Sequence, residues 1–247
     1  MNRRNILITG ANGAIGRALC ATFKNAGCRV IASDQAESSE SVYDEYIAVD
    51  LNRLCSKSVY RDKAFTLLRK QLNDNGLHAL INNAAIQIVS PAEQLTVDDW
   101  HNTMDVNLIA PFLLTKAFLP DLEKANGSVI NIGSIHAQLT KPHFTAYATS
   151  KAALVGMTRS LAVELGSRVR INAICPAAIA TPMLEAGFKD DPQGLHQLAS
   201  YHPSGCIGTL DDVTKAALYL ADATGRFLNG AILGLDGGIS SRLHDPA

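Results

Sequence analysis

The sequence predicts an α/β fold in which a doubly wound, seven-stranded parallel sheet carries helices on both faces. Short apolar runs alternate with helical patterns along all 247 residues, which is typical of parallel sheets built from strand–helix–strand units. Hydrophobic residues make up 47% of the chain, enough for a large core. Because no repeat, low-complexity tract or linker divides the chain, we expect a single domain over residues 1–247.

Seven apolar runs have the length of buried strands. They are residues 5–9, 29–33, 46–49, 78–81, 128–132, 169–174 and 231–235. Helical periodicity predicts helices over residues 14–26, 57–72, 96–104, 147–165 and 210–220, and a further long helix that runs through Asn107 and breaks near Pro120. Thr96 is a predicted N-cap, and Gly27 and Gly166 are predicted helix ends. Residues 181–203 contain Gly and Pro with weak periodicity, which favours a mobile lid with short helices.

Composition excludes several classes of protein. The net charge of −1 gives no electrostatic footprint for nucleic acid. The sequence contains no run of eighteen apolar residues, so we expect no membrane span. The five cysteines are odd in number and widely spaced, which argues against a disulfide framework or a zinc site and favours a reducing, cytoplasmic location. No His-x-x-x-His or compact carboxylate cluster indicates a metal.

A nucleotide-binding pattern opens the chain. Gly10, Gly13 and Gly16 lie between the first strand and the first helix, and Asp34 closes the second strand. Such glycines let the backbone approach a pyrophosphate at a helix N-terminus. An acid at this distance bonds the ribose hydroxyls of NAD. The alternative is an ordinary tight turn between a strand and a helix.

A second pattern carries candidate chemistry. Tyr147 and Lys151 are four residues apart, so on a helix they share one face. A free phenol has a pKa of about 10, and a neighbouring ammonium lowers it. Such a tyrosine exchanges a proton with an alcohol or a carbonyl, and the hydroxyl of Ser134 could hold the same substrate oxygen. Taken alone, a tyrosine and a lysine at this spacing are usually a solvated pair on a helix surface.

In register along the chain, these pieces resemble the short-chain dehydrogenase/reductase family, from residue 5 to residue 238. The matching residues are the glycine turn, Asp34, Asp50, Asn82-Asn83-Ala84, Asn107, Ser134, Tyr147 with Lys151, Pro176, Thr181 and Asp236-Gly237-Gly238. The resemblance implies a Rossmann-type sheet, a nicotinamide cofactor and hydride transfer at a carbon that bears oxygen. It also implies a homo-oligomer, either a tetramer or a dimer.

The resemblance assigns roles to individual residues. Tyr147 would be the acid/base, Lys151 would lower its pKa and bind the nicotinamide ribose, Ser134 would orient the substrate oxygen, and Asn107 would hold a water linked to Lys151. With Tyr147 and Lys151, the implied cofactor contacts are Gly10, Asn12, Gly13, Ala14, Ile15, Gly16, Asp34, Asp50, Leu51, Asn83, Ala84, Ala85, Pro176, Ile179 and Thr181. Each of three residues has a purely structural alternative: a helix kink for Asn107, an N-cap for Thr181 and a strand-end turn for Asp50.

The substrate side is predicted less fully. His136, Gln138, His143 and Ala177 are the candidate substrate contacts. A polar lining of this kind suits a small hydroxylated molecule such as a sugar or polyol, while the alternative places both histidines on the loop surface.

The sequence departs from the family pattern at three positions, Ala14, Ala85 and Ala177, where glycine is usual. The spacing around Ala14 resembles that of larger epimerases and dehydratases, so an enzyme that recycles its NAD is one alternative function. A non-catalytic cofactor-binding protein is another. We expect NAD in preference to NADP, because Asp34 has no basic neighbour in Ser33-Asp34-Gln35 and Gly13 stands where NADP-using relatives often carry a base.

Overall fold

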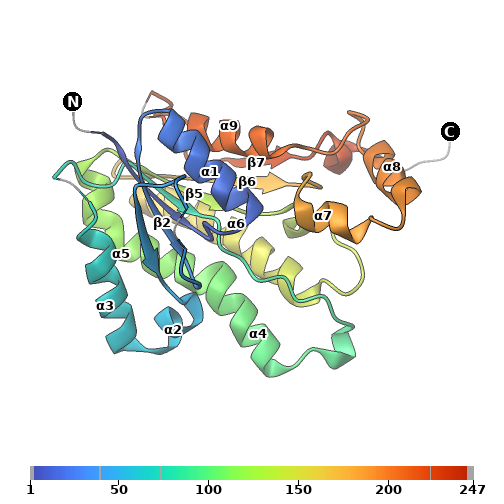
Figure 1. Ribbon diagram of the computed structural model, residues 1–247, viewed down its shortest axis with the longest axis horizontal. Helices are drawn as coiled ribbons and strands as arrows, with labels where there is room; N and C mark the ends of the chain where they lie inside the picture. Colours follow the sequence, from blue (N-terminus) through green and yellow to red (C-terminus); the bar gives the residue numbers. More distant parts are fainter. Residues whose placement is uncertain (1–2, 39, 73, 223, 244–247) are drawn as a thin grey trace.

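The computed structural model describes residues 3–38, 40–72, 74–222 and 224–243. Within them, seven parallel strands form one sheet in the order β3-β2-β1-β4-β5-β6-β7. The strands are β1 (Asn5–Thr9), β2 (Arg29–Asp34), β3 (Glu45–Ala48), β4 (Ala79–Asn82), β5 (Ser128–Ile132), β6 (Arg170–Pro176) and β7 (Ile232–Leu235). This arrangement confirms the predicted doubly wound, Rossmann-type sheet (Figure 1).

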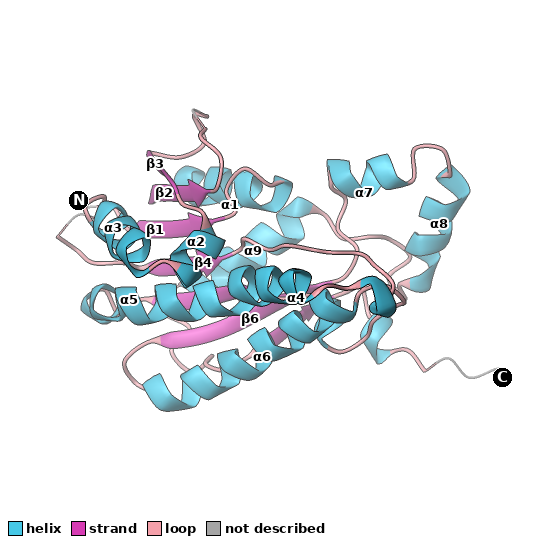
Figure 2. Cartoon of the chain, turned by 90° about the horizontal axis from the view of Figure 1, so that it is seen from below, coloured by secondary structure: helices cyan, strands magenta, loops and turns pink. Residues whose placement is uncertain are grey.

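The helices cover both faces of the sheet. They are α1 (Ala14–Asn25), α2 (Leu51–Ser56), α3 (Ser58–Arg69), α4 (Val97–Met104), α5 (Ala110–Lys124), α6 (Thr145–Leu165), α7 (Pro182–Gly187), α8 (Pro192–Tyr201) and α9 (Leu210–Ala221). Figure 1 shows α1 and α9 on one face, and Figure 2 shows α4, α5 and α6 together on the other. Among the described residues, no helix combines the length and apolar character that crossing a membrane requires.

Strand alternation explains the two layers. On β1, Ile6 and Ile8 pack in the cluster that contains residues of α1 and α9, whereas Leu7 packs in the cluster beneath α3, α5 and α6. Successive side chains of a strand point to opposite faces. Because helices bury both faces, β1, β4, β5 and β6 are buried along their whole length, as is typical of central parallel strands.

The helix predicted over residues 57–72 is confirmed as α3, but the short helix α2 before it was not predicted. Helix α2 begins where the Asp50 side chain accepts the Arg53 backbone N–H at 3.1 Å and caps it. The predicted helix break near Pro120 was wrong. Pro120 does not break α5. Arg69 on α3 binds the Ala117 carbonyl and reaches the Asp121 carboxylate at 3.0 Å, and these contacts hold the helix on both sides of the proline.

The strand order reverses between β1 and β4. From β1 the chain winds outward to β2 and β3, and from β4 it winds the other way to β7. In open parallel sheets the loops at the carboxyl ends diverge at such a point and leave a crevice for a ligand. The glycine turn follows β1 and Asn83 follows β4, so the topology brings the two predicted cofactor loops to this crevice.

Candidate active site

Close backbone contacts shape the glycine turn. Gly10 has φ +66°, and a Cβ there would lie 2.7 Å from the Cα of Ala84. A Cβ on Gly16 would lie 2.0 Å from the Gly10 carbonyl oxygen. At Gly13 a Cβ would meet nothing closer than 3.5 Å, and its φ of −72° suits any residue. The fold therefore requires glycine at positions 10 and 16. At position 13 the protein itself leaves room for a side chain.

Helix α1 begins at this turn without a side-chain cap, because its N-cap residue is Gly13. The N–H groups of its first turn have no partner within the helix. They face a cleft of about 550 Å³, which gives an anion binding site of the kind found at helix N-termini. The residues present therefore fit the pyrophosphate of a dinucleotide.

The cleft brings together most of the predicted cofactor contacts. Those that line it are Gly10, Gly13, Ala14, Ile15, Gly16, Asp34, Asp50, Leu51, Asn83, Ala84, Ala85 and Thr181. The predictions did not include Thr9, Arg17, Ser33, Gln35, Val49, Asn52, Ile86, Val106 and Pro182, which line it too. Asn12, Tyr147, Lys151, Pro176 and Ile179 are not among its lining residues.

Asn12 does not line the cleft but holds Asp34, which does. Its backbone N–H donates to Asp34 Oδ2 at 2.9 Å, and its side-chain amide donates to the Tyr46 hydroxyl at 3.0 Å. The other Asp34 oxygen accepts the Gln35 N–H at 2.7 Å. These bonds fix the Asp34 carboxylate at the end of β2, on the wall of the cleft.

Asn83 fastens the loop after β4 to the loop after β1. Its side-chain amide donates to the carbonyls of Thr9 and Gly10, both at 3.0 Å. The Thr9 hydroxyl in turn accepts the N–H groups of Asn83 at 3.1 Å and Ala84 at 3.2 Å. Ala85, where the family pattern has glycine, comes directly after these hydrogen-bonded residues. The alanine therefore leaves the loop after β4 fastened to the loop after β1.

Ser134 and Tyr147 meet at the end of β5. A hydrogen bond from the Ser134 side chain lowers the pKa of the Tyr147 phenol, but burial has the larger effect and raises that pKa above its ordinary value. Lys151 is not among the groups that shift the phenol's pKa in the chain by itself, so its predicted effect on Tyr147 stays a prediction. The spacing placed the two side chains correctly, but it did not show how strongly the site is desolvated.

Lys151 is bound to the backbone. Its side chain is 2% exposed, and its Nζ donates to the Ile132 carbonyl at 2.7 Å. The same Nζ lies 5.7 Å from the centroid of the Tyr147 ring. Burial lowers the pKa of Lys151 to about 8, because a low-dielectric site disfavours the charged form.

Asn107 lies in the π-helical turn η2 (Asp105–Ile109), which joins α4 to α5. Its side-chain oxygen accepts the Ile86 N–H at 2.8 Å, and its amide donates to the Ile86 carbonyl and the Ser150 hydroxyl, each at 2.9 Å. Single π-turns of this kind often occur at functional sites. Asn107 thus links the loop after β4 to the helix that carries Tyr147, and the helix-irregularity alternative is also correct.

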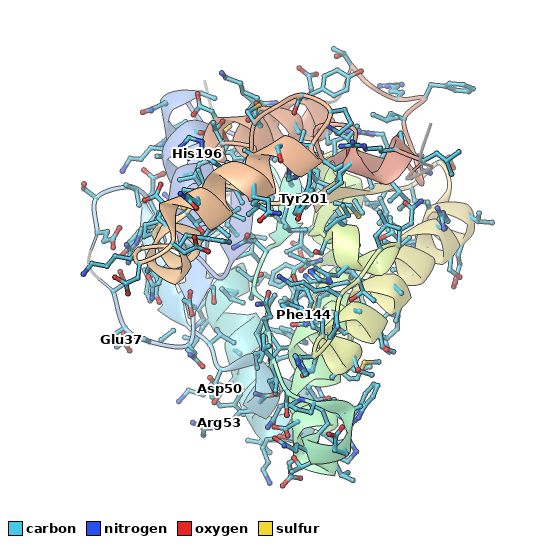
Figure 3. All side chains as sticks on the ribbon, turned by 90° about the vertical axis from the view of Figure 1, so that its right-hand side faces the viewer. Glu37, Asp50, Arg53, Phe144, His196 and Tyr201 are labelled. Atoms are coloured by element: carbon cyan, nitrogen blue, oxygen red, sulfur yellow. The ribbon has the colours of Figure 1, made fainter. Side chains whose placement is uncertain are left out.

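His136 is a predicted substrate residue that contacts the Tyr147 ring. Its ring stacks on Phe144 with centroids 4.5 Å apart and meets Tyr147 edge-on at 5.6 Å. Thr140 Oγ1 lies 2.9 Å from its Nδ1, and burial together with Lys141 lowers the pKa of the imidazole. In Figure 3, Phe144 lies between Asp50 and α8, the helix that carries His196 and Tyr201.

The other predicted substrate residues differ in exposure. His143 is exposed and has φ +73°, and its carbonyl accepts the Ser90 N–H at 3.0 Å. Gln138 is exposed too, just after the short helical turn at Ile135–Ala137. Ala177 donates its N–H to the Leu235 carbonyl at 3.0 Å. The structure therefore places one of the four, His136, against the Tyr147 ring and two, Gln138 and His143, on the surface.

Thr181 and Cys175 complete the site. Thr181 caps α7 by accepting the Leu184 N–H at 3.2 Å and also lines the cleft, so the two interpretations of this residue are compatible.

Cys175 was not predicted as a site residue. A Cβ on Gly133 would lie 2.6 Å from its Sγ, and burial raises the pKa of its thiol while the Ser134 backbone N–H opposes that shift. Its position before Pro176, at the end of β6, is the signal that could have indicated it.

No group of three or more potential metal-ligating side chains occurs within the described ranges.

Residues 10–240 match the family model described as enoyl-(acyl carrier protein) reductase. The chain belongs to the short-chain dehydrogenase/reductase family. It is therefore an oxidoreductase that transfers a hydride.

Two relatives illustrate the range of the family. The chain is 34% identical over 242 residues to an uncharacterised oxidoreductase of Schizosaccharomyces pombe, covering 96% of this chain and 90% of the relative. It is 31% identical over 246 residues to D-threitol dehydrogenase of Mycolicibacterium smegmatis, covering 94% and 91%.

Solved structures agree with the fold. Ligand-free aldohexose dehydrogenase of Thermoplasma acidophilum superposes with a TM-score of 0.87 at 29% identity, covering 100% of this chain and 97% of the other. 4-Hydroxyisoleucine dehydrogenase in complex with NADH gives 0.87 at 28% identity, covering 98% and 100%. Gluconate 5-dehydrogenase of Burkholderia cenocepacia with NADP and tartrate gives 0.86 at 26% identity, covering 98% and 97%.

Proposed function

We propose that this dehydrogenase uses NAD in preference to NADP and acts on a small polyhydroxylated alcohol or its carbonyl form, a sugar or polyol. The observation that carries the proposal is the meeting of Ser134, Tyr147 and His136 at the carboxyl edge of the sheet, next to a glycine-lined cleft. When bound, the nicotinamide gives or takes the hydride. The side chains of this cluster hold the substrate oxygen and move its proton.

Tyr147 is the proposed proton donor and acceptor. Its raised pKa keeps the phenol protonated at neutral pH, which suits proton donation to a carbonyl during reduction. The Ser134 side chain is hydrogen-bonded to the Tyr147 phenol, so its hydroxyl is positioned to bind a substrate oxygen at the same place. Lys151 would hold a ribose hydroxyl with its ammonium group, and Asn107 would hold the water that links Lys151 to solvent.

The preference for NAD rests on Asp34. Both of its carboxylate oxygens are occupied by backbone N–H groups, so the charge is fixed on the wall of the cleft. A ribose with two hydroxyls can bond to a carboxylate, whereas a 2′-phosphate would be repelled by it. The structures of relatives contain NADH in one case and NADP in another, so measurement on this chain must decide.

The substrate class rests on His136. Burial lowers its pKa, so the imidazole is neutral near pH 7, and Thr140 engages its Nδ1. The second ring nitrogen is then available to a hydroxyl next to the reacting carbon. D-Threitol dehydrogenase, aldohexose dehydrogenase and gluconate 5-dehydrogenase among the relatives carry names of polyhydroxylated substrates.

Residues 181–203 form the proposed lid of a single-domain enzyme. Helices α7 and α8 project beyond the edge of the sheet (Figure 1), and an isolated bridge between Ile179 and Gly208 joins the stretches that flank the segment. Closure of such a segment over a substrate would exclude water and complete the catalytic site. Hydrogen exchange should slow across this segment when cofactor and substrate bind, and unchanged exchange would contradict a lid.

We also propose a cytoplasmic homo-oligomer, a tetramer or a dimer. All five cysteines are free thiols, as expected in a reducing compartment. Exposed apolar side chains on helices, among them Phe112 and Val163, are surfaces that a second copy would cover. Light scattering of the purified protein measures the mass, and a monomer at micromolar concentration would contradict the assembly.

A substrate screen tests the proposal as a whole. Sugars, polyols, hydroxy acids and steroids are offered with NAD and with NADP, and reduced cofactor is followed by absorbance. We expect turnover of a sugar or polyol with a higher kcat/KM for NAD. Product formation without net NADH would instead indicate an epimerase or dehydratase, and no turnover together with tight NADH binding would indicate a non-catalytic protein.

A further inference from the structure

One cation lies among the described residues that line the cleft. The lining carries two carboxylates, Asp34 and Asp50, and one guanidinium, that of Arg17. Arg17 stands in the first turn of α1, on the same cleft as Asp34 and Gln35. A guanidinium there is chemically suited to bind a phosphate, which would oppose a preference for NAD.

The Arg17 side chain is paired with a residue outside the cleft. Its Nε lies 3.0 Å from Glu40 Oε1, and Glu40 does not line the cleft. The chain fixes Glu40 in place. Its backbone N–H donates to the Tyr43 hydroxyl at 2.7 Å, and the Tyr43 side chain is buried.

The loop that carries Glu40 is also tied to α1. Lys24 on that helix donates to the carbonyls of Ser41 at 2.7 Å and Tyr43 at 2.9 Å. Glu40 is therefore held on the same side of α1 as Arg17, and its carboxylate is the partner that the fold presents to the guanidinium.

We propose that Glu40 is a positioning residue for cofactor specificity: it holds Arg17 away from the position of a 2′-phosphate and so reinforces the discrimination against NADP that begins at Asp34. This inference rests on the proposed preference for NAD. Glu40 neutralises the one lining cation, so the adenosine end of the cleft presents net negative charge to a phosphate.

The effect of Glu40 is expected to be modest. The Arg17 and Glu40 side chains are 53% and 38% exposed, and an exposed ion pair contributes about 0.2–1 kcal/mol. That range corresponds to a change in affinity of up to about fivefold. Because solvent ions screen exposed charges, the effect should diminish at high salt.

A double-mutant cycle tests the inference. Glu40→Gln, Arg17→Met and the double variant are compared with the wild type in steady-state kinetics with NAD and NADP. Glu45→Gln is the matched control, because Glu45 is also 38% exposed and also pairs with an arginine, Arg29 at 2.9 Å, outside the lining of the cleft. Melting temperatures are measured for all five proteins.

Glu40→Gln should lower KM for NADP about two- to fivefold, with kcat and the NAD constants unchanged. The gain should vanish in the Arg17→Met background, shrink at 0.5 M salt and be absent in Glu45→Gln. No gain, an equal gain without Arg17, or an equal gain in Glu45→Gln would each overturn the inference. The NAD:NADP ratio of the wild type judges the proposed preference separately, since only the cycle reports on Glu40 and Arg17.

Discussion

The nucleotide end of the site and its reacting end are built by different means. At the nucleotide end the backbone forms the site, and side chains are absent where the ligand must approach: Gly10 and Gly16 leave no room for a Cβ. At the reacting end side chains form the site: Ser134 and Lys151 are buried, while Tyr147 and His136 are partly buried. Burial raises the pKa of Tyr147 and lowers that of Lys151.

The two ends should therefore fail in different ways. A single added carbon disturbs the nucleotide end, because its contacts are at the limit of van der Waals packing. The reacting end tolerates changes of shape better than changes of charge or hydrogen bonding, because its function depends on where protons reside. Substitutions at each end can separate binding from chemistry.

The largest expected effect is at the reacting end. Tyr147→Phe keeps the ring that packs against His136 and removes only the hydroxyl. We expect kcat to fall by about 10²–10⁴-fold, the usual contribution of general acid–base catalysis. Steady-state kinetics on the best substrate and NADH titration measure it. Near-native kcat would exclude Tyr147 as the acid/base, and a large loss of NADH affinity would show that the two ends are not separable.

The nucleotide end should respond to one methyl group. In Gly16→Ala the new Cβ would lie 2.0 Å from the Gly10 carbonyl oxygen, so the turn must shift, at a cost of about 1–3 kcal/mol in stability or cofactor affinity. Gly13→Ala is the matched control for stability, since its Cβ would meet nothing closer than 3.5 Å in the protein. Melting temperatures of both variants report the steric effect, and NADH affinity is measured for Gly16→Ala. Equal effects of both variants would contradict the steric account.

The buried ammonium of Lys151 predicts a pH dependence of folding stability. The folded-state pKa is lowered from 10.5 to about 8, so between these values the unfolded chain binds more protons than the folded chain. Stability must then rise with pH. Relative to Lys151→Met, the wild-type free energy of unfolding should increase from pH 8 to pH 10, by at most about 1.4 kcal/mol per pH unit. Denaturant melts of the two proteins measure the difference, and parallel pH profiles would contradict the buried charge.

The smallest of these effects concerns substrate recognition. His136→Phe retains a ring to stack on Phe144 and removes the ring nitrogens. One lost hydrogen bond should raise KM for a polyol roughly two- to tenfold and leave KM for NAD unchanged. Thr140→Val removes only the partner of Nδ1 and should have a smaller effect. If both variants keep the wild-type KM, His136 does not contact the substrate.

The sequence by itself determined the order of the strands and the positions of the candidate site residues. Strand length and alternation predicted the parallel sheet, since a buried parallel strand has few other compositions. Spacing placed Tyr147 beside Lys151, and the acid at Asp34 followed from its position after the second strand. Such features are local, so a linear pattern records them.

Tertiary structure alone decided which side chains are desolvated and which groups they hydrogen-bond to. The carbonyl that binds Lys151 belongs to Ile132, nineteen residues away, and the burial that raises the pKa of Tyr147 comes from several elements. Arg69 supports α5 around Pro120 from a different helix, so the proline did not end the helix as predicted. Desolvation and long-range hydrogen bonds depend on which elements pack together, and that packing exists only once the whole sheet has formed.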